Sequence, residues 1–399
     1  MIGTDMTAIG ETLIADLEEW KSDFIAIRHA LHQNPELGFA ETETSALVAR
    51  LLREWGYDVH TGLGATGVVG VLRAGDGARS IGLRADMDAL PITEQTHLPY
   101  ASRNPGRMHA CGHDGHTTTL LAAARYLATH RRFDGTLNLI FQPAEETLRG
   151  APAMMDAGLF ERFPCDAIYA LHNAPGVPVG KFIVASGSVL PSSDRVVIQV
   201  LGMGGHGAMP HRAKDPVPAA AEIVLALQGI VARNIAAGDP AVITVGVIKA
   251  GEAENVIPAS AEIRLSVRAL RPETRELLKV RIAQVVHGVV AAQGLTVDYD
   301  YQDGVPVLCN SEAETDFARN VIIETFGAEA LFDPPRSGLI GSEDFAWMLR
   351  ARPGSYVGIG NGQTGAHARM VHNPEYDFND DVIPYGAAYW IRLVERALT

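Results

Sequence analysis

The spacing of apolar residues divides the chain into alternating helical and extended segments. Apolar side chains recur near helical spacing from Leu13 to Leu31, which predicts one amphipathic helix over residues 12–33. Short runs rich in Val, Ile and Leu predict buried strands between further helices. The next predicted helices cover 44–55 and 117–131, and the predicted strands cover 67–73, 80–84, 136–141 and 167–171. This alternation indicates an α/β fold around a buried sheet.

The pattern changes near residue 191. The predicted strands there cover 195–201, 241–249, 262–268 and 296–301, and the predicted helices cover 216–234 and 272–293. The order βαββαβ is typical of a ferredoxin-like unit. The strands beginning at Arg195 and Glu262 alternate in hydrophobicity, so one face of this sheet is expected to be solvated. We therefore predict an inserted domain, 191–302, whose sheet edge or helices are available for a dimer contact.

After the insertion the first pattern resumes, so the domain that the insertion interrupts is predicted to be discontinuous, 1–190 and 303–399. Its second part contains predicted helices over 314–326 and 342–349, a buried strand over 354–359 and a closing helix.

Composition narrows the class of protein. The 399 residues are 47% hydrophobic and carry a formal net charge of −14, which argues against nucleic acid or anionic lipid as a partner. We find neither an apolar run near the ~18 residues of a membrane span nor a signal peptide. Three scattered cysteines, Cys111, Cys165 and Cys309, do not suggest a disulfide framework. A soluble, cytoplasmic globular protein is expected.

Residues that can bind a metal gather at the ends of the predicted strands. Residues 109–116 contain Cys111 and three histidines and lead into a helix. The strand 80–84 is followed by Asp86, the strand 136–141 by Glu145 and Glu146, and the strand 167–171 by His172. The carboxyl ends of strands in an α/β sheet form a crevice where ligands bind. Asp86 is expected to contact a metal or to orient an imidazole that does.

A late loop adds His372, which completes a set of five plausible ligands: Cys111, His113, Glu146, His172 and His372. Five exceed the four of a structural zinc site and suit two metals bridged by one group and by water. Glu145, next to a ligand but not itself one, is the expected general base. Thiolate and imidazole favour Zn²⁺, while Mn²⁺, Co²⁺ and Ni²⁺ stay open. The residues alone indicate metal-assisted hydrolysis of an unspecified substrate.

Other polar residues are uninformative when taken singly. His29 and His32 on the first helix are interpreted as structural. His206, in a glycine-rich segment, is also structural if judged alone, whereas Asn255 and Arg268 together could offer an amide and a guanidinium to an anionic substrate group.

Four segments carry a resemblance to a known family. They are Arg-Ala-Asp-Met-Asp-Ala-Leu-Pro (84–91), Met-His-Ala-Cys-Gly-His-Asp-Gly-His-Thr (108–117), Phe-Gln-Pro-Ala-Glu-Glu (141–146) and Gly-Gly-His-Gly-Ala-Met-Pro-His (204–211). Together they resemble the metallo-amidohydrolases that include hippurate hydrolases, N-acyl-amino-acid amidohydrolases and plant auxin-conjugate hydrolases. That family is part of the clan of aminoacylase and carboxypeptidase-type di-zinc metallopeptidases.

The resemblance implies a di-metal aminopeptidase-like catalytic domain with an inserted satellite domain for dimerisation. It implies the same five metal ligands, with Cys111 as the bridge between two divalent ions, and Glu145 as the base. It further implies that His206, often from a partner subunit, stabilises the oxyanion, and that Asn255 and Arg268 hold the substrate carboxylate. His109, His116 and His211 receive no role.

The implied reaction is hydrolysis of N-acyl-L-amino acids by a metal-bridging water, with a homodimer or higher homo-oligomer as the expected assembly. A dipeptidase or carboxypeptidase with the same metals is the alternative. A metal-binding protein without catalysis is a further alternative, but the presence of Glu145 beside all five ligands argues against it, since a binding protein needs no base.

Overall fold

The computed structural model describes residues 4–333 and 341–399. The chain forms two compact units. The first, called here the sheet unit, comprises Met1–Gly187, Cys309–Arg336 and Trp347–Thr399; the second, the insert unit, comprises Ser188–Leu308 and Ser337–Ala346. The predicted domain boundaries, 190/191 and 302/303, lie a few residues from these junctions. The role of the insert unit as a satellite domain for dimerisation stays a prediction.

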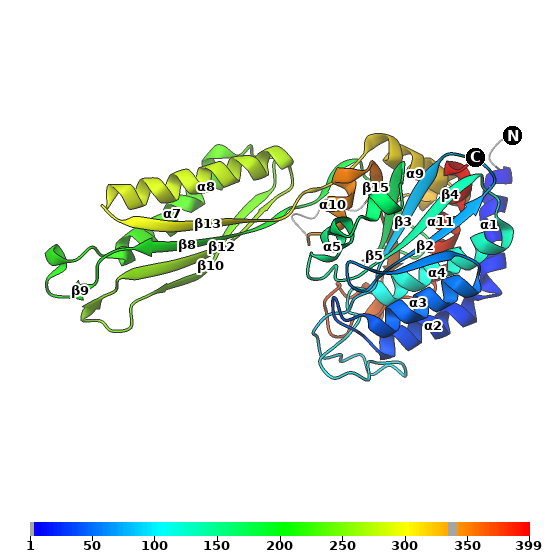
Figure 1. Cartoon of the computed structure of the whole chain (residues 1–399), viewed down its shortest axis with the longest axis horizontal. Helices are drawn as coiled ribbons and strands as arrows, with labels where there is room; N and C mark the ends of the chain where they lie inside the picture. The colour runs from blue at the N-terminus through cyan, green and yellow to red at the C-terminus, as the bar shows by residue number, and fades with distance from the viewer. Residues whose placement is uncertain (1–3, 334–340) are drawn as a thin grey trace. The chain divides into compact units, whose positions relative to one another are not determined.

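The sheet unit is built on a seven-stranded sheet in the order β1-β2-β4-β3-β5-β15-β6 (Figure 1). Its strands are β1 (Asp58–Leu63), β2 (Gly67–Ala74), β3 (Ser80–Asp86), β4 (Gly135–Gln142), β5 (Ala167–Pro175), β6 (Phe182–Ile183) and β15 (Gly354–Gly362). The four central strands β4, β3, β5 and β15 are parallel, and β2 and β6 pair with them antiparallel. Short strands β7 (Gly187–Leu190) and β14 (Leu308–Asn310) lie where the chain leaves and re-enters this unit.

Helices supply the rest of the large apolar core. They are α1 (Thr4–Glu18), α2 (Lys21–Gln33), α3 (Thr42–Glu54), α4 (His113–His130), α5 (Gly150–Asp156), α6 (Leu159–Arg162), α9 (Glu312–Phe326), α10 (Phe345–Ala351) and α11 (Val382–Ala397). Helix α4 packs against β3, α2 and α11, and it is buried along most of its length because alanines let its neighbours approach closely.

The register aligns the carboxyl ends of the parallel strands. Asp86 at the end of β3 pairs with Gln142 at the end of β4, and Arg84 pairs with Ala170 of β5. Two residues beyond those partners, Asp86 and His172 therefore lie at the same level of the sheet. The expected crevice at the carboxyl edge follows from this register.

The insert unit has two layers. Its sheet has the antiparallel order β10-β12-β8-β13, formed by β8 (Ser193–Leu201), β10 (Ala241–Ala250), β12 (Ser260–Ala269) and β13 (Thr296–Val305). Helices α7 (Pro216–Asn234) and α8 (Pro272–Ala292) cover one face of it (Figure 1). A small pair, β9 (Gly205–His206) with β11 (Val256–Ile257), lies beyond one end of the sheet. The predicted βαββαβ order is present, with alternate residues of β8 and β12 buried.

Two predictions from the apolar pattern need correction. The single helix over 12–33 is wrong, because α1 ends at Glu18 and α2 begins at Lys21. Leu17 and Phe24 are both buried and are seven residues apart, so the helical spacing continues across the break and hides it. Strand β1 was missed because most of its residues are exposed or half-exposed and show no apolar alternation.

Helix α7 is long and apolar enough to cross a membrane by length and composition alone, whereas no such segment was expected. Within the insert unit, Ala219, Ile223, Leu227 and Ile230 of this helix are buried in the core against the sheet. This packing accounts for its apolar character.

Candidate metal centre and active site

The segment from Cys111 to His113 is shaped by a glycine. Gly112 has φ 91°, in the left-handed region, and α4 begins at the next residue. A Cβ at Gly112 would lie 2.5 Å from Oη of Tyr376 and 2.6 Å from Nδ2 of Asn173. Only glycine fits this conformation and this space. The turn directs Cys111 and His113, two of the predicted ligands, into the same site.

The predicted ligands form two overlapping triplets. Cys111, His113 and His172 form one, and Cys111, Glu146 and His372 form the other; within each triplet the potential ligand atoms lie within 4.8 Å of one another. Sγ of Cys111 is 3.4 Å from Nε2 of His172. Because Cys111 belongs to both triplets, the arrangement suits a thiolate shared between two ions.

The loop after β4 contributes the paired carboxylates. Oε2 of Glu145 and Oε1 of Glu146 are each 3.9 Å from Nε2 of His113, and Oε2 of Glu146 is 3.4 Å from Nε2 of His372. The backbone N–H groups of both glutamates donate to the carboxylate of Asp88 at 3.1 and 3.0 Å. That carboxylate also lies 3.2 Å from Nδ1 of His113. Asp88 thus fixes a ligand and the expected base together.

We call Cys111, His113, Glu145, Glu146, His172 and His372 the ligand cluster. Among the described residues, Nε2 of His113 and Oε1 of Glu146 are buried without a hydrogen-bond partner. Buried polar atoms are seldom left unpaired, and both atoms face other ligand-type atoms. Thiol, imidazole and carboxylate are the donors that a borderline-soft divalent cation prefers. The residues therefore fit a divalent metal.

The electrostatics of the cluster oppose its assembly without a cation. Burial raises the pKa of Cys111, and the charge of Glu146 raises it further. Burial and the neighbouring His116 lower the pKa of His172. Burial acts against a charged His113, yet the charges of Asp86 and Cys111 outweigh it and raise the pKa of His113. A bound cation would stabilise the thiolate and the carboxylates together.

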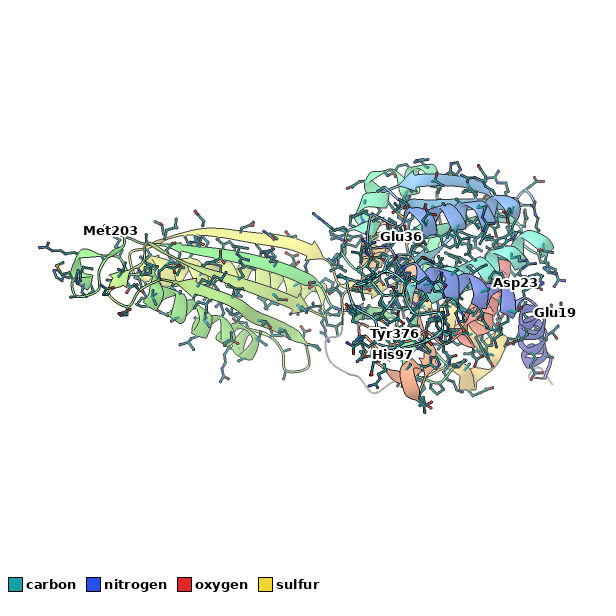
Figure 2. All side chains as sticks on the ribbon, turned by 90° about the horizontal axis from the view of Figure 1, so that it is seen from below. Glu19, Asp23, Glu36, His97, Met203 and Tyr376 are labelled. Atoms are coloured by element: carbon teal, nitrogen blue, oxygen red, sulfur yellow. The ribbon has the colours of Figure 1, made fainter. Side chains whose placement is uncertain are left out.

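A hydrogen-bonded chain supports the ligands from behind. Oδ1 of Asp86 lies 2.6 Å from Nδ1 of His116, whose Nε2 accepts from the backbone and the side chain of Asn173 at 3.0 Å each. The amide of Asn173 also donates to the carbonyl of Cys111 at 2.6 Å and accepts from the buried Tyr376 hydroxyl at 2.7 Å. Tyr376 is labelled in Figure 2. Both ring nitrogens of His116 therefore have partners within the protein, which leaves neither of them free to bind a metal.

Orientation of the imidazoles was expected of Asp86 alone, but Asp86 and Asp88 both contact histidines of the site. Asp86 orients His116 and is 3.8 Å from Nε2 of His113, while Asp88 lies on the other ring nitrogen of His113. Asp88 was missed, although it stands in the same acidic pair two residues on. The only signal in the sequence was that pair, since an Asx turn needs one aspartate rather than two.

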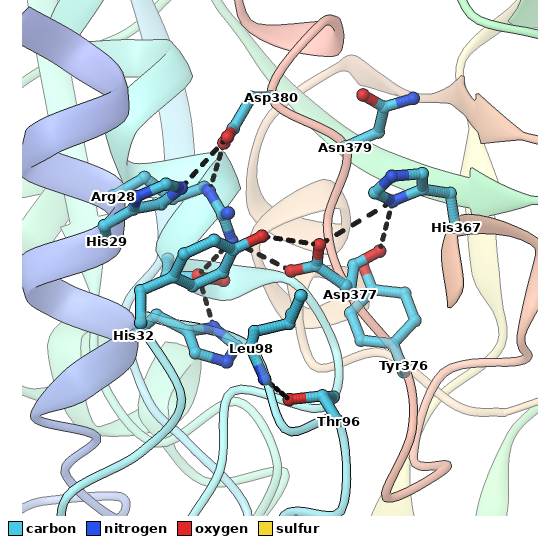
Figure 3. A network of polar contacts seen from close by, with 12 residues as sticks. Arg28, His29, His32, Thr96, Leu98, His367, Tyr376, Asp377, Asn379 and Asp380 are labelled. Atoms are coloured by element: carbon cyan, nitrogen blue, oxygen red, sulfur yellow. Dashed lines mark hydrogen bonds and ion pairs between the residues drawn. The ribbon is translucent and has the colours of Figure 1, made fainter. Parts of the chain in front are cut away.

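A second group of ionisable residues lies beside the site, and we call it the Arg28 cluster (Figure 3). Its members are Arg28, His32, Glu94, Asp114, Asp377 and Asp380. The fully buried Arg28 contacts all three aspartates, and Nδ1 of His32 lies 2.9 Å from Asp114. Burial acts against a charged His32, but Asp114 and Glu94 outweigh it and raise its pKa to about 9.

Two further histidines of the early segments, His29 and His109, also have defined surroundings. His29 pairs with Asp380 at 3.0 Å and stacks on Tyr100, in agreement with a structural role. His109 is buried, and burial lowers its pKa to about 4. Neither nitrogen of His109 has a hydrogen-bond partner among the described residues.

The predicted residues of the insert unit are separated within it. His206 pairs with Val256, and the N–H of Gly207 donates to the carbonyl of Asn255 at 2.8 Å, so His206 and Asn255 lie together. Arg268 stands near the other end of β12, where Nη1 contacts Oγ of Ser342 at 3.1 Å. From Ser260 to Arg268 a strand spans about 27 Å. One copy of the insert unit therefore does not bring Arg268 to Asn255.

The chain and its fold have counterparts among known proteins. The profile of peptidase family M20/M25/M40 matches residues 82–396. The chain belongs to this family. It is 44% identical to a hippurate hydrolase of Campylobacter jejuni, over 97% of this chain and 99% of that one, and 36% identical to an N-acetyl-L-cysteine deacetylase of Bacillus subtilis, over 98% and 92%. Among solved structures, the Bacillus subtilis YXEP protein, described as a dinuclear metal binding peptidase of family M20, matches with a TM-score of 0.83 and 31% identity, over 96% of this chain and 99% of that one.

Membership in this family confirms the resemblance drawn from the four motifs, the α/β fold class and the assignment as a metal-dependent hydrolase. The individual roles of the ligand-cluster residues, of His206, Asn255 and Arg268, and of Asp86 stay predictions.

Proposed function

We propose that this enzyme hydrolyses the amide bond of N-acyl-L-amino acids, releasing a carboxylate and a free amino acid. The observation that carries the proposal is the pair of triplets sharing Cys111, with Glu145 beside them. The hippurate hydrolase and N-acetyl-L-cysteine deacetylase relatives support the substrate class, since both are named for N-acyl amino acids and align over nearly the whole chain.

The ligand cluster would hold two divalent ions through Cys111, His113, Glu146, His172 and His372, with Cys111 common to both. Bound there, such ions supply an electrophile for the amide carbonyl and lower the pKa of a water. Zn²⁺ suits the thiolate and imidazoles best, and Mn²⁺, Co²⁺ and Ni²⁺ are tested beside it.

Glu145 acts as the general base. It removes a proton from the attacking water, whose oxygen forms a new bond to the acyl carbon. The same proton then passes to the amide nitrogen as the carbon–nitrogen bond breaks, so the amino acid leaves as a neutral amine. The backbone hydrogen bond from Glu145 to Asp88 keeps the base next to His113 through both transfers.

We propose that three residues of the insert unit take part in the reaction, drawn from two copies of the chain. His206 is proposed to stabilise the oxyanion, and Asn255 and Arg268 to hold the substrate carboxylate. The distance along β12 prevents one copy from bringing Arg268 and His206 to one small substrate, so we propose that they come from different subunits of a homodimer.

The edge strand β10 supports such a dimer. It is ten residues long, largely apolar and mostly exposed, including Val242 and Ile248. An uncovered apolar edge is a template for another strand, and a two-fold axis would pair it with its own copy. The molar mass in solution tests this proposal: a monomer at micromolar concentration with full activity would contradict it. We also propose a cytoplasmic location, where reducing conditions keep Cys111 as a thiol.

A hydrolysis panel tests the proposed reaction. Hippurate, N-acetyl-L-amino acids and dipeptides are incubated with enzyme loaded with Zn²⁺, Mn²⁺, Co²⁺ or Ni²⁺. We expect turnover of N-acyl amino acids and loss of activity on treatment with a chelator. Faster turnover of dipeptides would favour the dipeptidase alternative, and no turnover of any substrate with metal bound would rule out the proposal.

A further inference from the structure

One turn of the sheet unit combines three features that a purely structural turn does not need. Residues 37–40 form a β-turn closed by a hydrogen bond from the N–H of Ala40 to the carbonyl of Leu37 at 2.8 Å. Phe39, its third residue, has φ 64° and is 38% exposed. Glycine or asparagine is the usual choice for a left-handed third residue, because a bulky side chain is strained there.

The turn is held against the loop that carries the expected base. Gly38 packs so closely on that loop that a Cβ on it would lie 3.0 Å from Cα of Ala144, the residue before Glu145. The carboxylate of Glu41 accepts from the N–H of Ala144 at 2.8 Å. Phe39 therefore follows a residue that packs directly on Ala144, the neighbour of Glu145 in the chain. The turn that carries Phe39 is tied to the loop that carries Glu145.

Both flanks of the turn are anchored as well. The carbonyl of Glu36 accepts from the N–H of Ala89, next to Asp88, at 2.8 Å, and the Glu36 carboxylate accepts from N–H groups in the first turn of α3. The turn is thus held at a fixed position rather than free to fold the ring into the core. A rigid, strained and exposed aromatic residue beside an active site points to function rather than to packing.

The other exposed large apolar residues of the sheet unit, among those described, are Ile9 and Met370. Ile9 lies on α1 and lines a cavity of about 310 Å³ with residues of α1, α4 and α11, none of which belongs to the ligand cluster. Met370 precedes His372 by two residues but has no left-handed backbone. An exposed apolar side chain without strain needs no explanation. Phe39 differs from Ile9 and Met370 because it is both exposed and strained.

Besides Phe39, half of the non-glycine residues with positive φ among those described stand in the loops that carry Glu145, Glu146 and His372: Ala144, Leu148 and His372. Ala65, His97 and Arg131 lie outside these loops. Arg131 is left-handed at the C-terminal cap of α4, the end opposite His113. Arg131 therefore provides a matched control for backbone strain alone.

We propose that Phe39 is a specificity-determining residue whose ring forms an apolar wall for the acyl group of the substrate, and that it favours aryl or longer alkyl acyl groups over acetyl. This inference rests on the proposed hydrolysis of N-acyl amino acids. If substrates share the same amino acid and differ only in the acyl group, Phe39 on the turn 37–40 determines which of them the enzyme prefers.

The test compares two substrates with the same amino acid, hippurate and N-acetylglycine. Phe39→Gly removes the ring and relieves the strained φ, so its melting temperature should be no lower than that of the wild type. The ratio of kcat/KM for hippurate to that for N-acetylglycine should fall roughly tenfold, mainly through KM for hippurate. Phe39→Tyr, which keeps the ring, should restore the ratio, and Arg131→Gly should leave it unchanged.

The outcomes separate this inference from the reaction on which it rests. If the wild type hydrolyses both substrates but Phe39→Gly leaves the ratio unchanged, or lowers both rates equally, the wall assignment is wrong and the reaction stands. If the metal-loaded wild type hydrolyses neither substrate, both proposals are overturned.

Discussion

Two neighbouring clusters of the sheet unit use similar residues in opposite ways. The Arg28 cluster and the ligand cluster both combine histidines with acids, and most of these side chains are buried or half-buried, with His372 exposed. The first includes its own cation, Arg28, which contacts three aspartates, and its His32 has a raised pKa that favours a second positive charge. The ligand cluster includes no lysine or arginine. Its acids and thiol face one another and face histidines.

This difference separates a structural cluster from a metal centre. Buried carboxylates that pair with a buried guanidinium have their charge balanced within the protein, although Nη2 of Arg28 and Oδ1 of Asp114 have no hydrogen-bond partner among the described residues. These ion pairs tie α2, the start of α4 and the loop 377–380 together. Buried carboxylates and a thiol without such a partner require a cation from outside the chain. The presence or absence of a built-in cation, rather than the number of histidines, distinguishes the two.

The largest expected effect concerns Glu145. Glu145→Gln keeps the shape of the side chain but cannot accept the proton of water, so kcat for hippurate should fall roughly a thousandfold. The metal content should stay at the wild-type value because Glu146, rather than Glu145, is the expected ligand. Rates and metal content are measured on the same preparations, with Glu161→Gln on the exposed face of α6 as the control. Near wild-type activity would mean that another group is the base.

The sequence predicted the ligand cluster but not the Arg28 cluster with which it is compared. Ligand types and strand ends can be read from periodicity, and the five expected ligands do lie together. The partner of each histidine cannot be read in this way. His29, His32, His109 and His116 look alike in the sequence, and contacts with residues far along the chain, such as Asp380 and Asn173, distinguish them.

Distance along a strand is a further property that the sequence pattern does not give. Asn255 and Arg268 are thirteen positions apart in sequence and are expected to act as a pair; the length of β12 separates them within one copy, so the pairing stays a prediction that needs two copies. The need for glycine at position 112 also follows from the fold, because its left-handed conformation and the closeness of Tyr376 and Asn173 demand it.

The next expected effect is a pH dependence of stability that originates in the Arg28 cluster. The pKa of His32 is about 9 in the folded protein and 6.5 in its ordinary state. Its contribution to the free energy of unfolding, about 3 kcal/mol, is therefore present in full below pH 6.5 and is lost as the pH rises through 9. Urea unfolding of the wild type and of His32→Gln at pH 6 and pH 10 measures it.

The difference in stability between the two proteins should be largest at pH 6 and should shrink at pH 10. His130→Gln, at the far end of α4, controls for the loss of a histidine. A constant difference between wild type and His32→Gln across this range would mean that His32 is neutral in the folded protein.

The smallest expected effect concerns Asn173, which belongs to neither cluster but contacts residues beside both. Its amide joins the carbonyl of Cys111, the ring of His116 and the hydroxyl of Tyr376, and it follows His172 directly. Three ligand-bearing segments therefore share one side chain. Residues that orient metal ligands typically contribute a factor of about 10–100 in metal affinity, so Asn173→Ala should weaken metal binding by that factor.

A buried asparagine elsewhere in the same sheet separates positioning from packing. Asn138 in β4 donates to the carbonyl of Pro164 and to Sγ of Cys165 and is as buried as Asn173, but it touches no ligand segment. Asn138→Ala and Asn173→Ala should lower the melting temperature of the metal-free protein by similar amounts. Only Asn173→Ala should weaken Co²⁺ binding and alter the thiolate-to-cobalt absorption, because only that substitution releases the backbone of Cys111. Equal Co²⁺ affinities in the two variants would show that Gly112 and Asp88 suffice to position the ligands.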